Sequence, residues 1–231
     1  MPGRTLLYVE HDGMVYLVER DGVLTFPRPE EIPFEADRKV EMRFEDTVVW
    51  YCVPRLDAWP RHWIPKDRVP ALSNVDPLVQ RAVNASLVRE VSGALVVRAG
   101  RDGTAEVLMV KASRGFTKGM WNIPGGFVQY GESPEESVVR EIEEETGLAI
   151  EVEALLGVYS ERFASPYFMR GHMFLARAVT EALDLDPDEI AEARWMPARE
   201  AYEVTLNPFA RQALDRLDRD RGVLRGRPWA R

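Results

Sequence analysis

The chain has 231 residues, a length that suits one large domain or two unequal ones. A hydrophobic fraction of 45% is enough for a sizeable core, and a formal net charge of −8 argues against a protein that binds long nucleic acids, which needs a dense cationic face. The single cysteine, Cys52, excludes a disulfide framework and a four-cysteine zinc site. The N-terminus lacks the pattern of a signal peptide, and no apolar run approaches the roughly 20 residues that cross a bilayer, so we expect a cytoplasmic protein.

The first third of the sequence predicts short β-strands joined by tight turns. Asp-Gly pairs at positions 12–13 and 21–22 separate short apolar runs, which is a strong hairpin signal. The predicted strands are residues 6–10, 14–19, 23–26, 40–44 and 48–53. Residues 54–70 contain four prolines and show no period, so we expect an irregular connection there. The sequence therefore predicts a small β-rich N-terminal domain over residues 1–75.

A helix is expected next, over residues 76–85. Asp76 can cap it and Pro77 suits its first turn. A domain boundary is expected between about residues 70 and 89, and we interpret residues 76–90 as a linker helix.

From residue 91 the pattern changes to mixed α/β. Strands are predicted over residues 91–99, 106–111, 151–160 and 171–178, and helices over 133–147 and 207–220. In the first of these helices Ser133 can serve as the N-cap, Pro134 suits the first turn, and Gly147 suits the end. We therefore assign residues 91–231 to one α/β domain that closes with a C-terminal helix.

Three glutamates of the predicted helix 133–147 gather on one edge. At about 100° per residue, Glu141, Glu144 and Glu145 share a face, beside an apolar stripe that contains Val138 and Ile142. Like charges one turn apart repel, so a counter-charge is needed, and Mg²⁺ or Mn²⁺ prefers carboxylate oxygens. On the helix alone, an acidic solvated face is an equally good interpretation.

The spacing of the surrounding residues favours the metal site. Nine positions follow the pattern G-x5-E-x7-R-E-U-x-E-E-x-G-U, in which U is aliphatic, namely Gly126, Glu132, Arg140, Glu141, Ile142, Glu144, Glu145, Gly147 and Leu148. With this pattern the sequence resembles the Nudix (MutT-like) hydrolase family. The strict match covers residues 126–148 and a looser resemblance extends from about 91 to 202, whereas the first third of the chain is not covered.

The resemblance implies an α/β/α sandwich with a mixed sheet and a metal-dependent hydrolysis of phosphoanhydrides. It implies that Glu141, Glu144 and Glu145 bind Mg²⁺ or Mn²⁺, that the backbone carbonyl of Gly126 completes the coordination, and that Glu141 is also a candidate general base. Such a site neutralises the phosphates, activates a water molecule and needs no covalent intermediate. No Ser-His-Asp or Cys-His arrangement is recognisable in the sequence.

The resemblance also assigns supporting roles. Arg140 orients a glutamate, and Glu132 and Gly125 support the site. Many family members place a further catalytic or metal-binding acid shortly before the position of Trp195, and Glu189 is our candidate, with a surface turn as the alternative.

Substrate contacts are expected in two segments. The basic residues Lys111, Arg114 and Lys118, which precede residues 121–127, could bind phosphates. Phe163, Tyr167 and Arg170, which follow the predicted strand 151–160, could contact a base or ribose. Solvated loop charges and aromatic rings folded onto the core are the alternatives. The segment 121–127 resembles the ADP-ribose and NADH pyrophosphatase side of the family, but residues 160–163 lack the Ser-Gln-Pro-Trp motif of the NADH branch. Near positions 166 and 167, ADP-ribose enzymes of the family tend to have a proline and dinucleoside polyphosphate enzymes a tyrosine. This chain has both, Pro166 and Tyr167, so the resemblance does not choose between these two substrates.

The leading hypothesis is thus a pyrophosphatase that acts on ADP-ribose or a related nucleoside diphosphate linked to another group. A MutT-like triphosphate hydrolase is a second enzyme hypothesis, and a nucleotide-sensing regulator without turnover is a hypothesis of another class. The expected partner is a nucleotide, not a membrane or a long nucleic acid. For the β-rich domain, a role in a homodimer, a part in the substrate site and a structural cap are all open.

Overall fold

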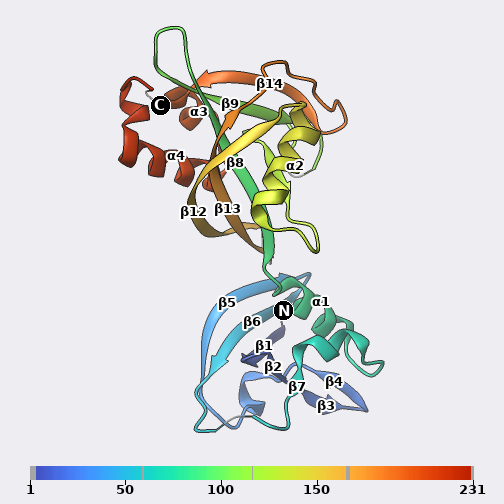
Figure 1. Cartoon of the computed structure of the whole chain (residues 1–231). Coiled ribbons are helices and arrows are strands. Elements are labelled where there is room, and N and C mark those ends of the chain that lie inside the picture. The colour runs from blue at the N-terminus through green and yellow to red at the C-terminus, as the bar shows by residue number, and fades with distance from the viewer. Residues whose placement is uncertain (1–3, 59, 116, 165–166, 230–231) are drawn as a thin grey trace. The chain divides into compact units, whose positions relative to one another are not determined.

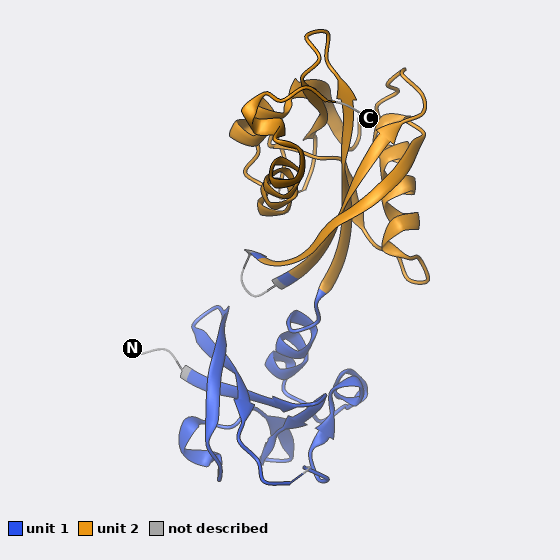
Figure 2. Ribbon diagram, turned by 60° about the vertical axis from the view of Figure 1, so that its left-hand side comes forward, with its two compact units in different colours: residues 1–88, 162–168 blue, residues 89–161, 169–231 orange. Residues whose placement is uncertain are grey.

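The computed structural model describes residues 4–58, 60–115, 117–164 and 167–229. It divides into two compact units, which Figure 2 colours separately. The first unit comprises Met1–Val88 and Arg162–Phe168, and the second comprises Arg89–Glu161 and Met169–Arg231. Among the described residues, no helix is long and apolar enough to cross a membrane.

The first unit is built on a five-stranded sheet, with the order β5-β6-β1-β2-β7. Its strands are β1 (Arg4–His11), β2 (Met14–Tyr16), β5 (Ala36–Phe44), β6 (Thr47–Pro54) and β7 (Ile64–Pro65). A separate hairpin contains β3 (Val18–Arg20) and β4 (Val23–Thr25), so the strand predicted over residues 14–19 is broken at Leu17. The predicted irregular connection 54–70 was only partly right, because it contains β7 and the start of the 3₁₀ helix Lys66–Ala71.

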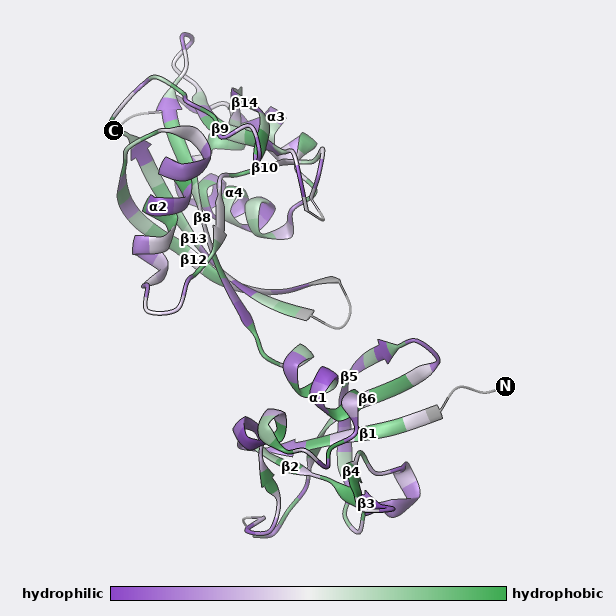
Figure 3. Cartoon of the chain, turned by 90° about the vertical axis from the view of Figure 1, so that its right-hand side faces the viewer, coloured by the Kyte–Doolittle hydropathy of each residue, from purple (hydrophilic) through white to green (hydrophobic). Residues whose placement is uncertain are grey.

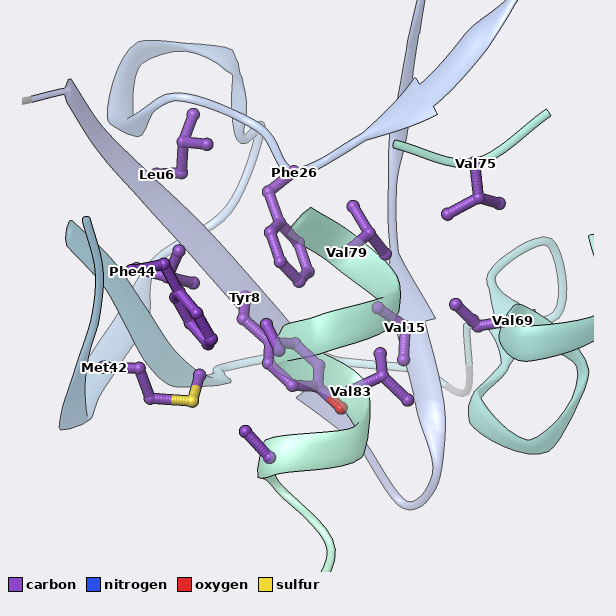
Figure 4. Close-up of a cluster of buried hydrophobic side chains, with 13 residues drawn as sticks. Leu6, Tyr8, Val15, Phe26, Met42, Phe44, Val69, Val75, Val79 and Val83 are labelled. Atoms are coloured by element: carbon purple, nitrogen blue, oxygen red, sulfur yellow. The ribbon is translucent and has the colours of Figure 1, made fainter. Parts of the chain in front are cut away.

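Helix α1 (Pro77–Ala85) covers one face of this sheet. Asp76 caps it by accepting a hydrogen bond of 2.8 Å from the Leu78 backbone N–H. Its buried Val79 and Val83 point into the same cluster as Tyr8 and Phe26 of the first unit, as Figure 4 shows. The segment expected to be a linker helix is therefore part of a domain core, because its apolar face completes the core that the strands alone leave open.

The second unit has a seven-stranded mixed sheet. Its main path has the order β10-β9-β8-β13-β12, while β11 pairs with β8 and β14 pairs with β9. The strands are β8 (Arg89–Ala99), β9 (Ala105–Ala112), β10 (Trp121–Asn122), β11 (Gly125–Phe127), β12 (Ile150–Ala164), β13 (Tyr167–Ala178) and β14 (Ile190–Pro197). Strands β8 and β13 run parallel, whereas β9 and β11 are antiparallel to β8.

Helices cover both faces of this sheet, which confirms the predicted α/β/α sandwich. Figure 1 shows α2 (Pro134–Thr146) on one side, and α4 (Pro208–Arg221) with the short α3 (Ala198–Val204) on the other. The fully buried Val138 and Ile142 of α2 pack on Ala94, Val96 and Leu108 of the sheet. Figure 3 shows the matching contrast, with hydrophobic colour along the strands of the second unit and hydrophilic colour on much of α2. The apolar stripe thus holds α2 on the sheet, and the glutamate edge beside it runs from the buried Glu145 to the exposed Glu144.

Candidate functional site

The ends of α2 are set by local hydrogen bonds. The Ser133 hydroxyl accepts from the Glu136 N–H at 3.2 Å, and the Glu136 carboxylate accepts from the Ser133 N–H at 2.8 Å, which makes a capping box. Gly147 ends the helix in a left-handed conformation with φ of 69°. The predicted helix 133–147 is thereby confirmed, and its frame fixes where the glutamates lie.

The three glutamates of the α2 edge differ in burial. Glu145 is 8% exposed as a residue, and the side chains of Glu141 and Glu144 are 14% and 58% exposed. Burial raises the pKa of Glu145 to about 8 and also raises that of Glu141, because the charged form loses its hydration. The charge of each of these two carboxylates is unfavourable unless a positive group compensates it.

Two consecutive glycines bring the backbone of β11 against these carboxylates. The Gly125 N–H donates a hydrogen bond of 3.0 Å to the Glu145 carboxylate. Gly125 has a φ of 142°, and a β-carbon on it would lie 2.6 Å from the α-carbon of Gly93 on β8. A β-carbon on Gly126 would lie 2.5 Å from the carboxylate carbon of Glu141. Only glycine fits at position 125, where the contact is with backbone, whereas a β-carbon at position 126 would push the Glu141 carboxylate out of its place.

Arg140 lies at the centre of a network on the same edge. Its guanidinium donates to both oxygens of Glu132, at 2.5 and 3.0 Å, and to Glu141 at 2.9 Å and Glu144 at 2.8 Å. It also donates to the Phe127 carbonyl at 3.2 Å, next to Gly126. These bonds hold the pKa of Glu132 at about 2 and raise that of Arg140. A planar fork of this kind fixes the rotamers of the glutamates around it.

Glu189 lies near this carboxylate edge, as its position before Trp195 suggested. Its negative charge contributes to raising the pKa of both Glu141 and Glu145. It also forms an ion pair with Arg114, and its side chain is 32% exposed. Strand β14, which follows it and was not predicted from the sequence, pairs with β9 and so carries Glu189 to the end of that strand.

The remaining predicted substrate residues are dispersed. Lys111 lies 5.7 Å from the centre of the Trp121 ring, Lys118 is exposed, and Arg170 forms an ion pair of 3.4 Å with Glu90 near the start of β8. The side chains of Phe163 and Tyr167, and Pro166 as a whole, lie outside the described part of the chain. Of the six residues, the structure therefore brings Arg114 to the carboxylate edge through Glu189.

A buried pair of hydroxyls under the site was not predicted from the sequence. Ser92 of β8 donates a hydrogen bond of 3.0 Å to Ser137 of α2, and both residues are buried. The Ser137 hydroxyl also accepts from Arg140 at 3.4 Å. Helical spacing could have placed Ser137 on the sheet side, one turn before Arg140, but its partner on β8 is visible only in three dimensions.

In the described part of the chain, no three His, Cys, Asp or Glu side chains are arranged to hold a metal ion as they stand. Arg140 engages Glu141 and Glu144, and the Gly125 N–H engages Glu145. The donor chemistry nevertheless fits a hard dication, because all three candidate donors are carboxylates and burial raises the pKa values of Glu141 and Glu145, so that a positive charge is needed to stabilise their ionised forms.

Comparison with known proteins agrees with this fold. Residues 89–217, more than half of the chain, match the family model of the NUDIX domain, and the chain therefore belongs to the NUDIX hydrolase family. An ADP-ribose pyrophosphatase of Methanocaldococcus jannaschii is 40% identical over 110 residues, which cover 48% of this chain and 60% of that protein, less than two thirds of its length.

Two further relatives extend the comparison. A MutT-like protein of Streptomyces ambofaciens is 28% identical over 151 residues, which cover 64% of this chain and 84% of that protein. The crystal structure of a C. elegans Ap4A hydrolase binary complex has a TM-score of 0.51 at 19% identity and covers 58% of this chain and 97% of that one. At this identity, the second likeness concerns the fold alone.

Proposed function

We propose that this chain hydrolyses the phosphoanhydride bond of a nucleoside diphosphate linked to another group, with ADP-ribose as the first candidate substrate. The observation that carries the proposal is a pair of carboxylates packed against the glycine backbone of β11, the buried Glu145 and the partly buried Glu141. The 40% identity to an ADP-ribose pyrophosphatase supports the choice of substrate.

In this proposal Glu141, Glu144, Glu145 and the Gly126 carbonyl hold Mg²⁺ or Mn²⁺. A bound dication would neutralise phosphate charge and make a water molecule more acidic. Arg140 keeps the glutamates oriented through its hydrogen bonds to Glu141 and Glu144. Glu141 or Glu189 accepts the proton of the attacking water, since both carboxylates belong to the same edge.

Product analysis tests the proposal. The full chain is incubated with ADP-ribose, NADH, a dinucleoside polyphosphate and nucleoside triphosphates, with Mg²⁺ or Mn²⁺, and the products are separated by anion exchange. We expect AMP and ribose 5-phosphate from ADP-ribose. A nucleoside monophosphate with pyrophosphate, formed from triphosphates alone, would instead support the MutT-like activity. Nucleotide binding without any turnover would support the sensing regulator and contradict hydrolysis.

The domain and assembly expectations are proposals as well. We propose that residues up to about 88 form a domain separate from the hydrolase domain, with a homodimer as one of its open roles. Limited proteolysis between the two units and light scattering of the full chain test these two statements.

A further inference from the structure

The loop between β9 and β10 is fastened to the turn that carries Glu189. The backbone N–H of Ser113 donates to the Glu189 carbonyl at 2.8 Å, and its hydroxyl donates to the Asp188 carbonyl at 2.5 Å. Next to it in the chain, Ala112 pairs with Ile190 in the β9–β14 ladder. One serine thus binds two consecutive carbonyls and fixes the backbone on which the Glu189 side chain stands.

The same turn is tied to the C-terminal end of α2. The Asp184 N–H donates to the Thr146 carbonyl at 2.9 Å, and the Asp186 N–H donates to the Glu145 carbonyl at 3.3 Å. Within the turn, the Asp186 carboxylate accepts from the Asp188 N–H at 2.8 Å. Because both ends of the turn are held, Glu189 keeps a defined position relative to Glu145.

Arg114 is the counter-charge on this side of the carboxylate edge. It pairs with Glu189, and within the described part of the chain no other cationic side chain does so. Arg140 is engaged by Glu132, Glu141 and Glu144 instead. The Arg114 side chain is 67% exposed, so it can leave Glu189 without uncovering a buried charge.

We propose that Arg114 is a displaceable counter-ion of Glu189, which pairs with this glutamate in the free chain and moves to a substrate phosphate when a divalent cation is bound. This inference rests on the proposed function. In this inference Glu189 takes the metal-binding role and is a further ligand of the cation beside Glu141, Glu144 and Glu145. The Arg114 guanidinium and the dication then compete for the Glu189 carboxylate, so Arg114 lowers the affinity of the free chain for the cation. A phosphoanhydride offers Arg114 another anionic partner, so nucleotide and cation should bind cooperatively.

The test measures Mn²⁺ binding to the full chain in the absence of nucleotide, by the electron paramagnetic resonance signal of free Mn²⁺. We expect Arg114→Ala to bind Mn²⁺ about 3-fold more tightly than wild type, the size that an exposed ion pair allows. The same variant should bind ADP-ribose about 10-fold more weakly in the presence of Ca²⁺, because a charged phosphate contact is lost. In a Glu189→Gln background, Arg114→Ala should leave Mn²⁺ affinity unchanged.

Lys118→Ala is the matched control, because it removes one exposed positive charge from the same loop. If Lys118→Ala increased the affinity for Mn²⁺ as much as Arg114→Ala, the effect would be due to overall charge and the proposal would be overturned. Unchanged or weaker Mn²⁺ binding by Arg114→Ala would overturn it as well. Arg114→Gln, which keeps a polar side chain with the same first three carbons, replaces Arg114→Ala if the latter does not fold. The proposed function would fail on its own if the Mn²⁺ affinities of wild type and the variants differed as expected but wild type hydrolysed no nucleotide.

Discussion

Gly126 on β11 and Glu141 on α2 touch so closely that a side chain on the glycine would displace the Glu141 carboxylate. A β-carbon there would lie 2.5 Å from the carboxylate carbon of Glu141. Gly126 is not among the glycines with a left-handed backbone, so the contact and not the backbone conformation requires glycine. The backbone of β11 at Gly126 and the side chain of Glu141, a proposed metal ligand, are therefore packed directly against each other.

Gly126→Ala should lower the turnover of ADP-ribose by about 100-fold, since a displacement of a reacting group by about 1 Å can have that effect. The change is measured as initial rate at saturating substrate and Mg²⁺. Gly100→Ala is the control, because its β-carbon would meet only the flexible Glu106 side chain, at 3.1 Å, and we expect the wild-type rate. Equal rates for both variants would contradict the importance of the Gly126–Glu141 contact.

Glu145→Gln should lower turnover by at least about 100-fold, because the variant loses a charge in the buried part of the site while its amide oxygen can still accept from Gly125. Glu143→Gln, on the exposed side of the same helix, should retain the wild-type rate. Both rates are measured with Mg²⁺ and with Mn²⁺. If Glu144→Gln and Glu145→Gln both turned over like wild type, the metal assignment would be wrong.

Stability of the metal-free chain should fall as the pH rises from about 4.5 to about 8 and should then level off. The pKa of Glu145 is raised from 4.5 to about 8 by burial, so its contribution to stability is complete below pH 4.5 and is lost as the pH passes 8. Every tenfold difference between the ionisation constants of the folded and unfolded chain corresponds to ~1.4 kcal/mol of stability. Guanidinium unfolding between pH 5 and 9 with a chelator measures this loss. Glu145→Gln should flatten the dependence, and parallel curves for the two proteins would refute the assignment.

Added Mg²⁺ should stabilise the chain more at high pH than at low pH. The carboxylates must be deprotonated to bind the cation, and the raised pKa of Glu145 makes deprotonation at low pH unfavourable. The measurement is the shift of the melting temperature with Mg²⁺ at pH 6 and pH 9. If Mg²⁺ raised the melting temperature equally at pH 6 and at pH 9, Glu145 would be excluded as a ligand.

Arg140→Lys should lower both turnover and stability, the latter by roughly 1–3 kcal/mol. A lysine ammonium cannot reproduce the bonds that the guanidinium makes to Glu132, Glu141 and Glu144 at the same time. Arg199→Lys is the control, because its pair with Glu203 on α3 is exposed. Thermal unfolding and initial rates check both effects, and a fully active Arg140→Lys would show that the fork does not orient the glutamates.

The first unit contains a partly buried ion pair whose loss should lower its stability. Lys66 binds Glu10 at 2.9 Å, with side chains only 15% and 11% exposed, and the same Glu10 carboxylate accepts from the Tyr8 hydroxyl at 2.6 Å. Lys66→Met leaves that carboxylate without its cation and should destabilise the unit by about 1–3 kcal/mol. Lys39→Met, which breaks an exposed pair with Asp37, should change stability by less than about 1 kcal/mol. Denaturant unfolding distinguishes the two.

Features that depend on nearby positions in the chain were predictable. Helix α2, its Ser133 cap and its Gly147 end follow from residues within one or two turns, as does the common edge of the three glutamates. The Asp-Gly turns of the first unit, where Asp12 and Asp21 adopt a positive φ, are local in the same sense. In each case the controlling interaction joins residues that are close in sequence, so spacing alone carries the information.

What the sequence determined by itself was thus the helix, its acidic edge and, through the spacing from Gly126 to Leu148, the family. Only the tertiary structure decided that α1 completes the core of the first unit, that Ser92 bonds Ser137, and that Arg114 meets Glu189. Arg114 and Glu189 lie 75 positions apart and become neighbours because β14 pairs with β9. Pairing between distant strands depends on the packing of the whole sheet, and no local period encodes it. For the same reason, the need for glycine at position 126 becomes visible only once α2 is folded against β11.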